Sequence, residues 1–351
     1  MKQDIKNIDF EAFVRYLRKK GQPPYRAKQV FDWLYSKKVG SFALMNNIPR
    51  AAIEALEQDF YISTLTLQKT VQSKDGTQKF LFALEDGTMI ESVCIPHRER
   101  ITLCLSTQVW CKYGCTFCAS AQSGFVRNVT KAELANQIIA IANTLKGIRV
   151  SNIVFMGIGE PLDNYENVLA AVALINAKHG FAIGQRKITI STAGVVTGIK
   201  RLAREGLQIE LSVSLHSADE KKRSEIMPIN KKYPLTELIP ALKEFVKLTK
   251  RKITFEYMLL GAFNTGERDA ALLVKTIKGI HCTINLIPFN PVAQSRFSVP
   301  TPKETAFFRD YLLTHHCEVT IRRPRGQDIE AACGQLRLQN SCIVSLKGAS
   351  L

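Results

Sequence analysis

The spacing of apolar residues changes along the chain and separates regions of different secondary structure. Over residues 8–60, apolar side chains recur three or four positions apart beside basic residues, which predicts a small module of amphipathic helices. Over residues 62–95 the spacing shortens, and the pairs Asp75-Gly76 and Asp86-Gly87 are typical of tight turns between strands. We therefore expect this second region to form a meander of short antiparallel strands.

From about residue 101 to residue 322, short β-rich runs alternate with stretches of helical periodicity. The expected strands lie near 101–106, 152–156, 187–191, 209–214, 253–258 and 282–287. The expected helices lie near 130–146, 164–178, 196–205, 235–249, 267–279 and 302–315. This alternation predicts an α/β fold with a parallel sheet, and six β/α units indicate an open, partial (β/α)6 barrel, because eight units close a complete one.

These changes of pattern divide the chain into four expected parts. Residues 1–60 form a helical accessory domain, and residues 61–100 form an antiparallel β extension. Residues 101–322 form the partial barrel, and residues 323–351 form a C-terminal loop and tail.

Residues of unusual chemistry follow the ends of nearly all the expected strands. Because the carboxyl ends of parallel strands meet at one edge of the sheet, where ligands bind in such folds, we expect a binding site there. The segments concerned are a cysteine cluster after the first strand, residues 157–161 after the second, 191–192 at the end of the third, 214–216 after the fourth and 288–291 after the sixth.

The composition is that of a globular chain with an excess of positive charge. Of the 351 residues, 46% are hydrophobic and 23% are charged, so the chain can build a core. The formal net charge of +17 favours a polyanionic partner such as nucleic acid. The sequence has neither an apolar run long enough to span a bilayer nor an apolar stretch near its start, so we expect a cytoplasmic protein with no membrane partner.

Part of the positive charge is gathered in short runs. A single run of this kind is usually a solvated face, but five of them exceed what solubility requires, and phosphate contacts would use them. The runs are Arg18-Lys19-Lys20, Lys221-Lys222-Arg223, Lys231-Lys232, Lys250-Arg251-Lys252 and Arg322-Arg323.

Nine cysteines are an odd number in a large chain, and in a reducing cytosol they indicate metal or catalytic thiols rather than a disulfide scaffold. Cys111, Cys115 and Cys118 form a C-x3-C-x2-C cluster. A structural zinc ion usually takes four ligands from two spaced pairs, so zinc fits this loop poorly. A [4Fe–4S] cluster fits better, because three cysteine ligands leave one iron open to a substrate.

The cysteine cluster, with the aromatic Phe117 before its last member, resembles that of the radical S-adenosylmethionine (SAM) superfamily. In that superfamily the open iron binds the amino and carboxyl groups of SAM. The segment Gly157-Ile158-Gly159-Glu160-Pro161 resembles the glycine-rich motif that holds the SAM amino group. A glycine-rich loop after a strand is a weak signal alone, and its spacing from the cysteines makes it a strong one.

Over essentially its whole length the chain resembles the RlmN/Cfr family of RNA adenine methyltransferases. The most diagnostic match is Ala331-Ala332-Cys333-Gly334-Gln335-Leu336. One position departs from the family pattern, because Trp110 stands before the first cysteine where a glycine is usual. Further matching segments are 25–29, 33–35, 186–192, 214–216, 227–230, 284–291, 325–326 and 328–329.

The resemblance implies that a methyl group reaches adenine through a cysteine of the protein. One SAM molecule would methylate Cys333, and a second, bound to the reduced cluster, would yield the radical that activates this methyl group for addition to an electron-poor carbon. Cys104 would then attack the methylated sulfur and form a transient disulfide with Cys333, while Glu91 aligns with a proposed proton acceptor. The positions that match SAM contacts are Gly159, Glu160, Ser191, Ser214, Leu215, His216 and Asn290.

The same resemblance implies the partners of the chain. The expected substrate is 23S rRNA, at an adenosine of the peptidyl-transferase region, and for some members of the family also an adenosine next to the tRNA anticodon. Residues 1–60 would then be an RNA-binding accessory domain. A flavodoxin-like protein would supply the electron, and we expect a monomer.

Several of these residues also have a purely structural reading. Glu91 could be a solvated carboxylate on a strand, and Ser191, Ser214 and Asn290 could bond to backbone at strand ends. His216 is expected to be structural despite its motif. The other cysteines are expected to be core residues, as lone cysteines usually are: Cys94, Cys282, Cys317 and Cys342.

Two other functions are compatible with parts of the pattern. The first is methylation of adenine at carbon 8, the activity of the Cfr branch, although the stretch from Cys118 to Phe125 looks more like the carbon-2 branch. The second is a metal-containing RNA-binding protein without enzymatic activity. Such a protein would keep the basic surface but would need neither Cys104 nor Cys333.

Overall fold

The computed structural model describes residues 2–121, 124–145, 147–292, 295–322 and 324–336. Three residues used in the sequence analysis lie outside the described residues. They are Gln122 of the stretch that favours the carbon-2 branch, Arg323 of a basic run, and Cys342 of the cysteines expected in the core. Residue 146 of an expected helix and residues 337–351 of the expected tail also lie outside them.

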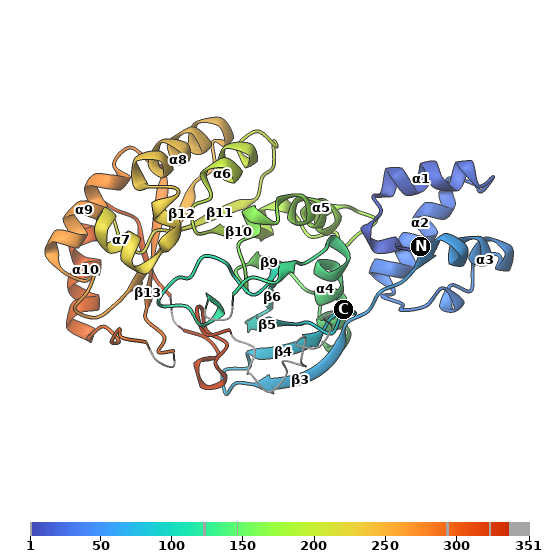
Figure 1. Ribbon diagram of the computed structural model, residues 1–351, viewed down its shortest axis with the longest axis horizontal. Coiled ribbons are helices and arrows are strands. Elements are labelled where there is room, and N and C mark those ends of the chain that lie inside the picture. Colours follow the sequence, from blue (N-terminus) through green and yellow to red (C-terminus); the bar gives the residue numbers. More distant parts are fainter. Residues whose placement is uncertain (1, 122–123, 146, 293–294, 323, 337–351) are drawn as a thin grey trace, which may run out of the picture.

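A curved sheet of ten strands is the centre of the molecule (Figure 1). The strands run in the order β14-β13-β12-β11-β10-β9-β6-β5-β4-β3, and all neighbours from β6 to β14 are parallel. Their bounds are β3 Thr66–Gln72, β4 Gln78–Ala83, β5 Met89–His97, β6 Arg100–Cys104, β9 Asn152–Phe155, β10 Ile188–Thr192, β11 Glu210–Ser214, β12 Ile253–Leu259, β13 Cys282–Pro288 and β14 Val319–Ile321.

Helices connect the parallel strands, and most of them follow the outer side of the curved sheet (Figure 1). This arrangement buries both faces of the strands, as the apolar sequence of β12 requires, and Ile253, Phe255 and Tyr257 have no exposed surface. The helices are α4 Lys131–Thr144, α5 Tyr165–Asn176, α6 Val196–Leu202, α7 Glu220–Ile226, α8 Leu235–Thr249, α9 Glu267–Ile277 and α10 Pro302–Thr314.

The expected α/β architecture with an open, partial barrel is confirmed, and each of the six expected strands is present within two residues of its expected bounds. Several elements were not expected, among them β14 and α7. The edge strand β14 has only three residues, too few to show a periodic pattern, and α7 is a short helix of mostly charged residues. β14 and β3 are the two edges of the sheet, so it curves without closing.

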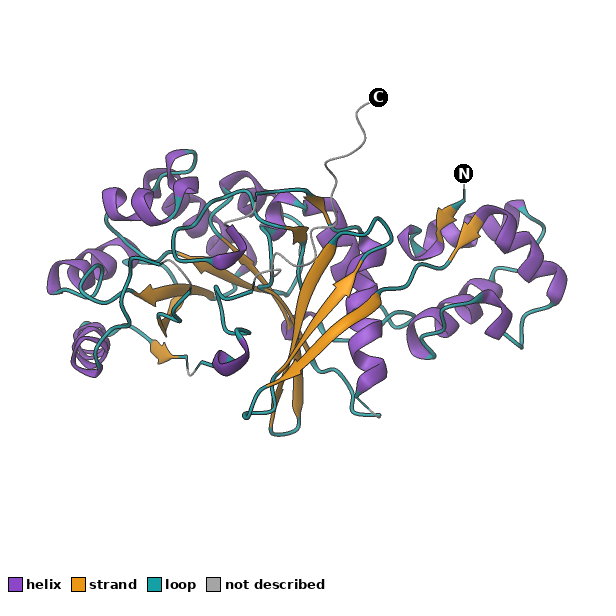
Figure 2. Ribbon diagram, turned by 60° about the horizontal axis from the view of Figure 1, so that its bottom comes forward, coloured by secondary structure: helices purple, strands orange, loops and turns teal. Residues whose placement is uncertain are grey.

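The antiparallel strands β3, β4 and β5 continue the same sheet, because β5 pairs with β6 in the register Val93↔Cys104. Both expected turns are present. Gly76 and Gly87 adopt positive φ angles of 84° and 79°, which glycine tolerates without steric cost. Figure 2 shows these long strands in front of the parallel part.

The N-terminal helices α1 (Phe10–Lys19), α2 (Tyr25–Phe31) and α3 (Arg50–Asp59) pack around their own apolar cluster, which also includes Ala135 and Ile139 of α4. A buried polar contact joins the same surfaces, since Lys6 Nζ donates to Ser63 O at 2.8 Å and to Asn136 Oδ1 at 2.6 Å. The helical region is therefore fixed against α4.

The remaining short elements complete the chain. They are the strands β1 Gln3–Asp4, β2 Phe60–Tyr61, β7 Gln108–Val109 and β8 Arg127–Asn128, the π-helical turn Asp32–Ser36, and the 3-10 helices Ile5–Asn7, Phe42–Leu44, Ala119–Ala121, Pro161–Asp163, Gln185–Lys187, Pro228–Lys231 and Gln327–Ile329. Within the described ranges, no helix combines the length and the apolar composition that crossing a bilayer requires.

Candidate active site

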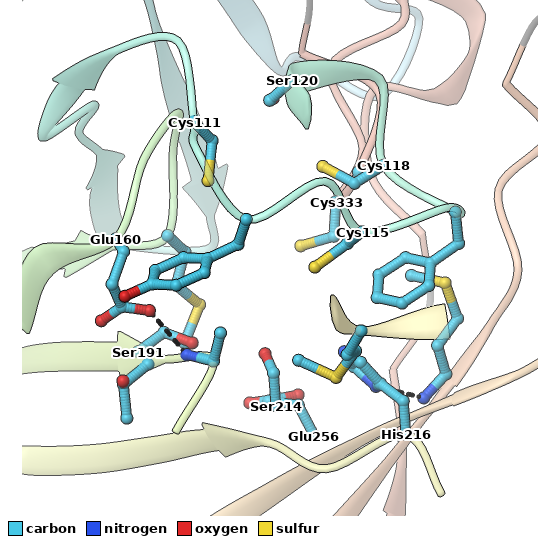
Figure 3. Close-up of a pocket in the computed structure, with 18 of the residues that line it drawn as sticks. Cys111, Cys115, Cys118, Ser120, Glu160, Ser191, Ser214, His216, Glu256 and Cys333 are labelled. Carbon is cyan, nitrogen blue, oxygen red and sulfur yellow. Dashed lines mark hydrogen bonds between the residues drawn. The ribbon is translucent and has the colours of Figure 1, made fainter. Parts of the chain in front are cut away.

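A cavity lies at the carboxyl ends of the parallel strands, at the edge where the sequence gathers its unusual residues (Figure 3). We call it the first cavity. Strand ends form one wall, and the loop between β7 and β8, which we call the cysteine loop, forms another. The expected site residues that line it are Cys111, Cys115, Cys118, Gly159, Glu160, Ser191, Ser214, His216 and Cys333.

The cysteine loop is closed at its base by the pairing of β7 with β8, in the register Gln108↔Asn128. Further along the loop, Thr116 N donates to Ile226 O at 3.0 Å and Cys118 N donates to Cys115 O at 3.1 Å. Trp110 takes a positive φ of 62°, and its side chain is buried in the main apolar core. The departure from the family pattern at this position therefore adds no ring to the lining of the cavity.

The three cysteines of the loop are partly buried. Burial raises the pKa of Cys111 to about 12 and raises the pKa of Cys115 and of Cys118 as well. Bonding to a metal centre would offset this effect, because a coordinated thiol is held deprotonated. No group of three or more His, Cys, Asp or Glu side chains in the described ranges forms a site for a single metal ion. Three sulfur ligands on one cavity wall fit a cluster of several irons.

The glycine-rich loop after β9 packs directly on the base of the cysteine loop. A Cβ atom on Gly157 would lie 2.7 Å from the backbone of Leu105, and one on Gly159 would lie 2.5 Å from the Gln108 side chain. Gln108 Oε1 also accepts a hydrogen bond from Glu160 N at 2.9 Å. The two glycines therefore allow an approach that no larger residue permits.

Glu160 is buried at one end of the first cavity, with only 2% of its surface exposed. Its carboxylate accepts hydrogen bonds from Leu162 N at 3.0 Å and from Ala193 N at 2.7 Å. Burial nevertheless dominates and raises the pKa of Glu160 to about 7. A cationic ligand group placed here would restore the charged carboxylate.

A buried arginine orders the strand ends that carry Ser191 and Ser214. The guanidinium of Arg223 has no exposed surface and donates to three backbone carbonyls, those of Ala193, Ser214 and Leu215. Sequence inspection placed Arg223 in a basic run and missed this role.

The observed contacts of His216 and Leu215 are with other residues of the fold, so both have a structural role. His216 Nδ1 accepts a hydrogen bond from Met258 N at 2.9 Å, so any proton on the neutral ring sits on Nε2, and burial lowers its pKa to about 3. The Leu215 side chain is fully buried and does not line the first cavity. A contact of Leu215 with SAM stays a prediction.

A second cavity adjoins the first and contains Cys104, Cys333 and Asn290. Cys333 lines both cavities, although 228 residues lie between it and Cys104 in the sequence. Cys104 is 8% exposed, and burial raises its pKa to about 12. Asn290 Nδ2 donates to Cys333 O at 3.3 Å, so Asn290 holds the Cys333 segment and does not line the first cavity.

The segment that carries Cys333, residues 326–336, is bonded to the cysteine loop. Ala119 N donates to Gly334 O at 2.7 Å, and Ser120 Oγ donates to Leu336 O at 2.6 Å. Together these bonds fix the distance between the loop and Cys333.

The antiparallel strands hold the other side of this segment. Asp328 accepts hydrogen bonds from Ser73 Oγ at 2.6 Å and from Lys74 N at 3.1 Å. Lys79 Nζ donates to Glu330 O at 3.1 Å and lies 3.4 Å from a carboxylate oxygen of Glu91. Glu91 is 4% exposed and lines neither cavity, so the expectation of a solvated strand carboxylate is wrong.

The basic runs differ in their surroundings. Arg223 is buried, Lys222 forms an ion pair with Asp269, and Lys252 forms one with Glu318. The charges of these residues are therefore used in contacts within the chain. The run at 18–20 and the pair at 231–232 are exposed.

Two charged residues of the first cavity were not expected from the sequence. Glu256 is the one charged residue of the apolar strand β12, and a carboxylate inside such a strand was the available signal. Arg322 follows β14 directly, and its place beside Arg323 made it look like part of a surface run.

Comparison with known proteins agrees with this geometry. Residues 105–274 match the model of the radical SAM superfamily, and residues 3–62 match that of the ribosomal RNA large subunit methyltransferase N-terminal domain. A crystal structure of a radical SAM methyltransferase from Sphaerobacter thermophilus superposes with a TM-score of 0.91 at 38% identity, covering 95% of this chain and 99% of that one. Fold and site thus define a protein of the radical SAM superfamily.

Similar proteins of known family show to which family within the superfamily the chain belongs. A "Probable dual-specificity RNA methyltransferase RlmN" of Clostridium perfringens is 42% identical over 336 residues, covering 95% of this chain and 96% of the relative. A protein of the same name from Akkermansia muciniphila is 43% identical over 337 residues, covering 94% of each chain. The chain belongs to the RlmN family.

Replacing Gly159 by Ala should destabilise the protein strongly. The residue has a φ of 103°, and the added Cβ would meet Gln108, so strain and overpacking together should lower the free energy of unfolding by about 3 kcal/mol. The control is Gly206→Ala, where φ is also positive at 66° but no atom lies within 4 Å, with an expected loss of about 1 kcal/mol. Urea unfolding measures both, and equal losses would contradict the packing argument.

Proposed function

We propose that this chain is a radical SAM methyltransferase that methylates carbon 2 of an adenosine in the peptidyl-transferase region of 23S rRNA, and an adenosine next to the tRNA anticodon. The observation that carries the proposal is the position of Cys333 in the common wall of two cavities, one with the cysteine loop and one with Cys104. A methyl carrier needs access to the methyl donor on one side and to a resolving thiol on the other. The dual-specificity relatives support the choice of RNA.

The side chains that line the first cavity fit the iron–sulfur cluster and the SAM molecule that the family uses. Cys111, Cys115 and Cys118 would hold a [4Fe–4S] cluster, which with an electron from a flavodoxin-like protein supplies reductive cleavage of SAM. Glu160 offers a buried carboxylate for the SAM amino group, and Ser191 and Ser214 line the same cavity. Two molecules of SAM would be used in each turnover.

The two remaining cysteines would act in order. The Cys333 sulfur first takes a methyl group and later bonds to the base through the resulting methylene carbon. The Cys104 thiolate then attacks the Cys333 sulfur, an S–S bond forms, and the bond between that sulfur and the methylene carbon breaks. The carbon keeps the electron pair of the broken bond and takes up a proton, which makes it the methyl group of the product. A reductant must reopen the disulfide before the next turnover, and a cellular thiol can supply the electrons.

Glu91 is the carboxylate proposed to accept the proton that the base loses. It lies on β5 two residues before Val93, and alternate residues of a strand share a face, so it belongs to the face that lines the second cavity. Its neighbour Lys79 also holds the Cys333 segment.

RNA binding is proposed for the N-terminal helical region together with the exposed basic residues. The region matches the N-terminal domain model of an rRNA methyltransferase and contains the exposed Arg18 and Lys19. Its fixed packing on α4 would hold the RNA in one orientation relative to the cavities. The protein is proposed to act as a cytoplasmic monomer.

The roles of Cys333 and Cys104 predict different behaviour of their variants. Cys104→Ala should accumulate a covalent protein–RNA adduct, because addition needs only Cys333 while release needs a second thiol. Cys333→Ala, the double variant and Cys118→Ala should form none. The readout is a slow-migrating band on a denaturing gel. An adduct in Cys333→Ala would remove that residue as carrier, and normal turnover by Cys104→Ala would remove Cys104 from the reaction.

The release step should depend on pH. Burial raises the pKa of Cys104 to about 12, so the thiolate is the minor form at neutral pH and its fraction grows as pH rises. The lifetime of the adduct in the unmodified enzyme should fall by about tenfold for each unit between pH 7 and pH 9. Rapid quenching at several pH values measures this lifetime, and a lifetime that does not change with pH would be inconsistent with attack by the Cys104 thiolate.

A further inference from the structure

A third cavity lies at the end of the sheet that is opposite to the candidate site. Cys282 is the first residue of β13, near whose other end Ile287 lines the first and second cavities. Cys282 and Cys317 both line the third cavity, which extends between the end of α9 and the turn that follows α10. Both cysteines were expected in the core. They pack against the main core but are only partly buried.

The register of two neighbouring parallel strands places these cysteines beside each other. β13 pairs with β14 in the register Ile284↔Val319, and Ile284 N donates to Glu318 O at 2.8 Å, so the alignment holds one residue before β14 begins. Two residues further back along each strand, the same alignment brings Cys282 opposite Cys317. Side chains two residues apart share a face, so both thiols are on the face of Ile284 and Val319. Neighbouring strands are about 4.8 Å apart, and a disulfide joins Cα atoms about 4.4–6.8 Å apart.

An ion pair beside the cysteines agrees with this alignment. Lys252 Nζ lies 2.7 Å from Glu318 Oε1, and Lys252 directly precedes β12. β12 is aligned with β13 in the register Ile253↔Cys282. The ends of the three strands therefore lie side by side at this edge of the sheet.

The two thiols are free, and their partial exposure lets a small reagent reach them. Among the residues that the structure describes, no set of three or more His, Cys, Asp or Glu side chains is arranged to hold a metal ion, although His315 lines the same cavity. His315 Nδ1 instead lies 2.8 Å from Tyr311 O, and its ring stacks on that of Tyr311. The pair is therefore suited to sulfur–sulfur chemistry rather than to a metal.

We propose that Cys282 and Cys317 form a redox-sensitive pair that a small disulfide, such as oxidised glutathione, converts into a disulfide bond between β13 and β14. One protein thiolate attacks the reagent, forms a mixed disulfide and releases one glutathione thiolate. The second protein thiolate then attacks the protein sulfur of the mixed disulfide, and the second glutathione leaves. The reagent takes up two electrons and the two thiol protons, so it becomes two molecules of reduced glutathione. The inference does not depend on the proposed function.

The bond would act on the edge of the sheet. β14 is an edge strand of three residues, and the residue that follows it, Arg322, lines both cavities of the candidate site. A crosslink before β14 would close the chain between residues 282 and 317 and remove conformational freedom from the unfolded state. It would hold β14 from the end that is away from the site, so it would leave the cavities open.

The test uses the full-length protein with its cluster, kept free of oxygen and treated with oxidised and reduced glutathione at a series of ratios. Cys282 lies in the tryptic peptide 279–296 and Cys317 in the peptide 310–322, each as the only cysteine. After alkylation of the remaining thiols, mass spectrometry should detect these two peptides joined, in a yield that rises with the share of oxidised glutathione. Burial raises the pKa of both thiols, so the link should form faster as pH rises.

Single variants separate the pair from the other cysteines. In Cys282→Ser or Cys317→Ser the remaining cysteine has no partner for the second step, so it should keep bound glutathione. Cys94→Ala, which removes a buried cysteine of β5, is the matched control and should form the link as the original protein does. Oxidation should raise the melting temperature of the original protein by about 4 °C more than that of Cys282→Ser, which retains every other cysteine.

Two results would overturn the inference. One is glutathione bound separately to Cys282 and to Cys317 with no joined peptides. The other is a link between Cys282 and Cys94 in similar yield, because such a link would report an unfolded chain rather than the register of the strands. Both are measured on the unmodified protein, so they do not depend on whether the serine variants fold.

Discussion

A short piece of chain near the C-terminus, residues 326–336, is held from two sides, and the candidate site depends on this attachment. On one side the cysteine loop donates hydrogen bonds to the carbonyls of Gly334 and Leu336. On the other, the turn between β3 and β4 binds Asp328, and Lys79 bonds to the carbonyl of Glu330. Together with the bond from Asn290 Nδ2 to Cys333 O, these contacts fix Cys333 relative to the cavities. The bond from Ser120 Oγ to Leu336 O is buried, so breaking it would leave an unsatisfied partner, whereas Asp328 is exposed to water.

This constraint explains why an antiparallel extension stands beside a partial barrel. An open parallel sheet provides one edge for ligands but does not cover it. Here the sheet continues through β5, β4 and β3, and the last turn of that extension reaches the C-terminal segment. The β5–β6 pairing places Val93 beside Cys104, so the extension also forms a wall of the second cavity.

Most of the fold could be predicted from the sequence, because parallel strands buried on both faces have apolar sequences and Asp-Gly pairs are typical of tight turns. β14 was missed, because its three residues carry no periodicity, and with it the position of Arg322. The cysteine loop was visible from spacing alone, whereas Cys333 was found only through a family resemblance. No local pattern connects residues 104 and 333, because their proximity arises from the path of the whole sheet. Glu256 shows that a charged residue within an apolar strand can mark a position that lines the site.

The proposed methylation of carbon 2 of adenine in RNA is tested most directly by mass spectrometry of nucleosides from purified 23S rRNA and tRNA. The RNA is taken from cells with and without this gene and from cells that carry the Cys333→Ala form. We expect 2-methyladenosine in both RNAs only when the unmodified gene is present. The appearance of 8-methyladenosine instead, or identical nucleosides in all three samples, would contradict it.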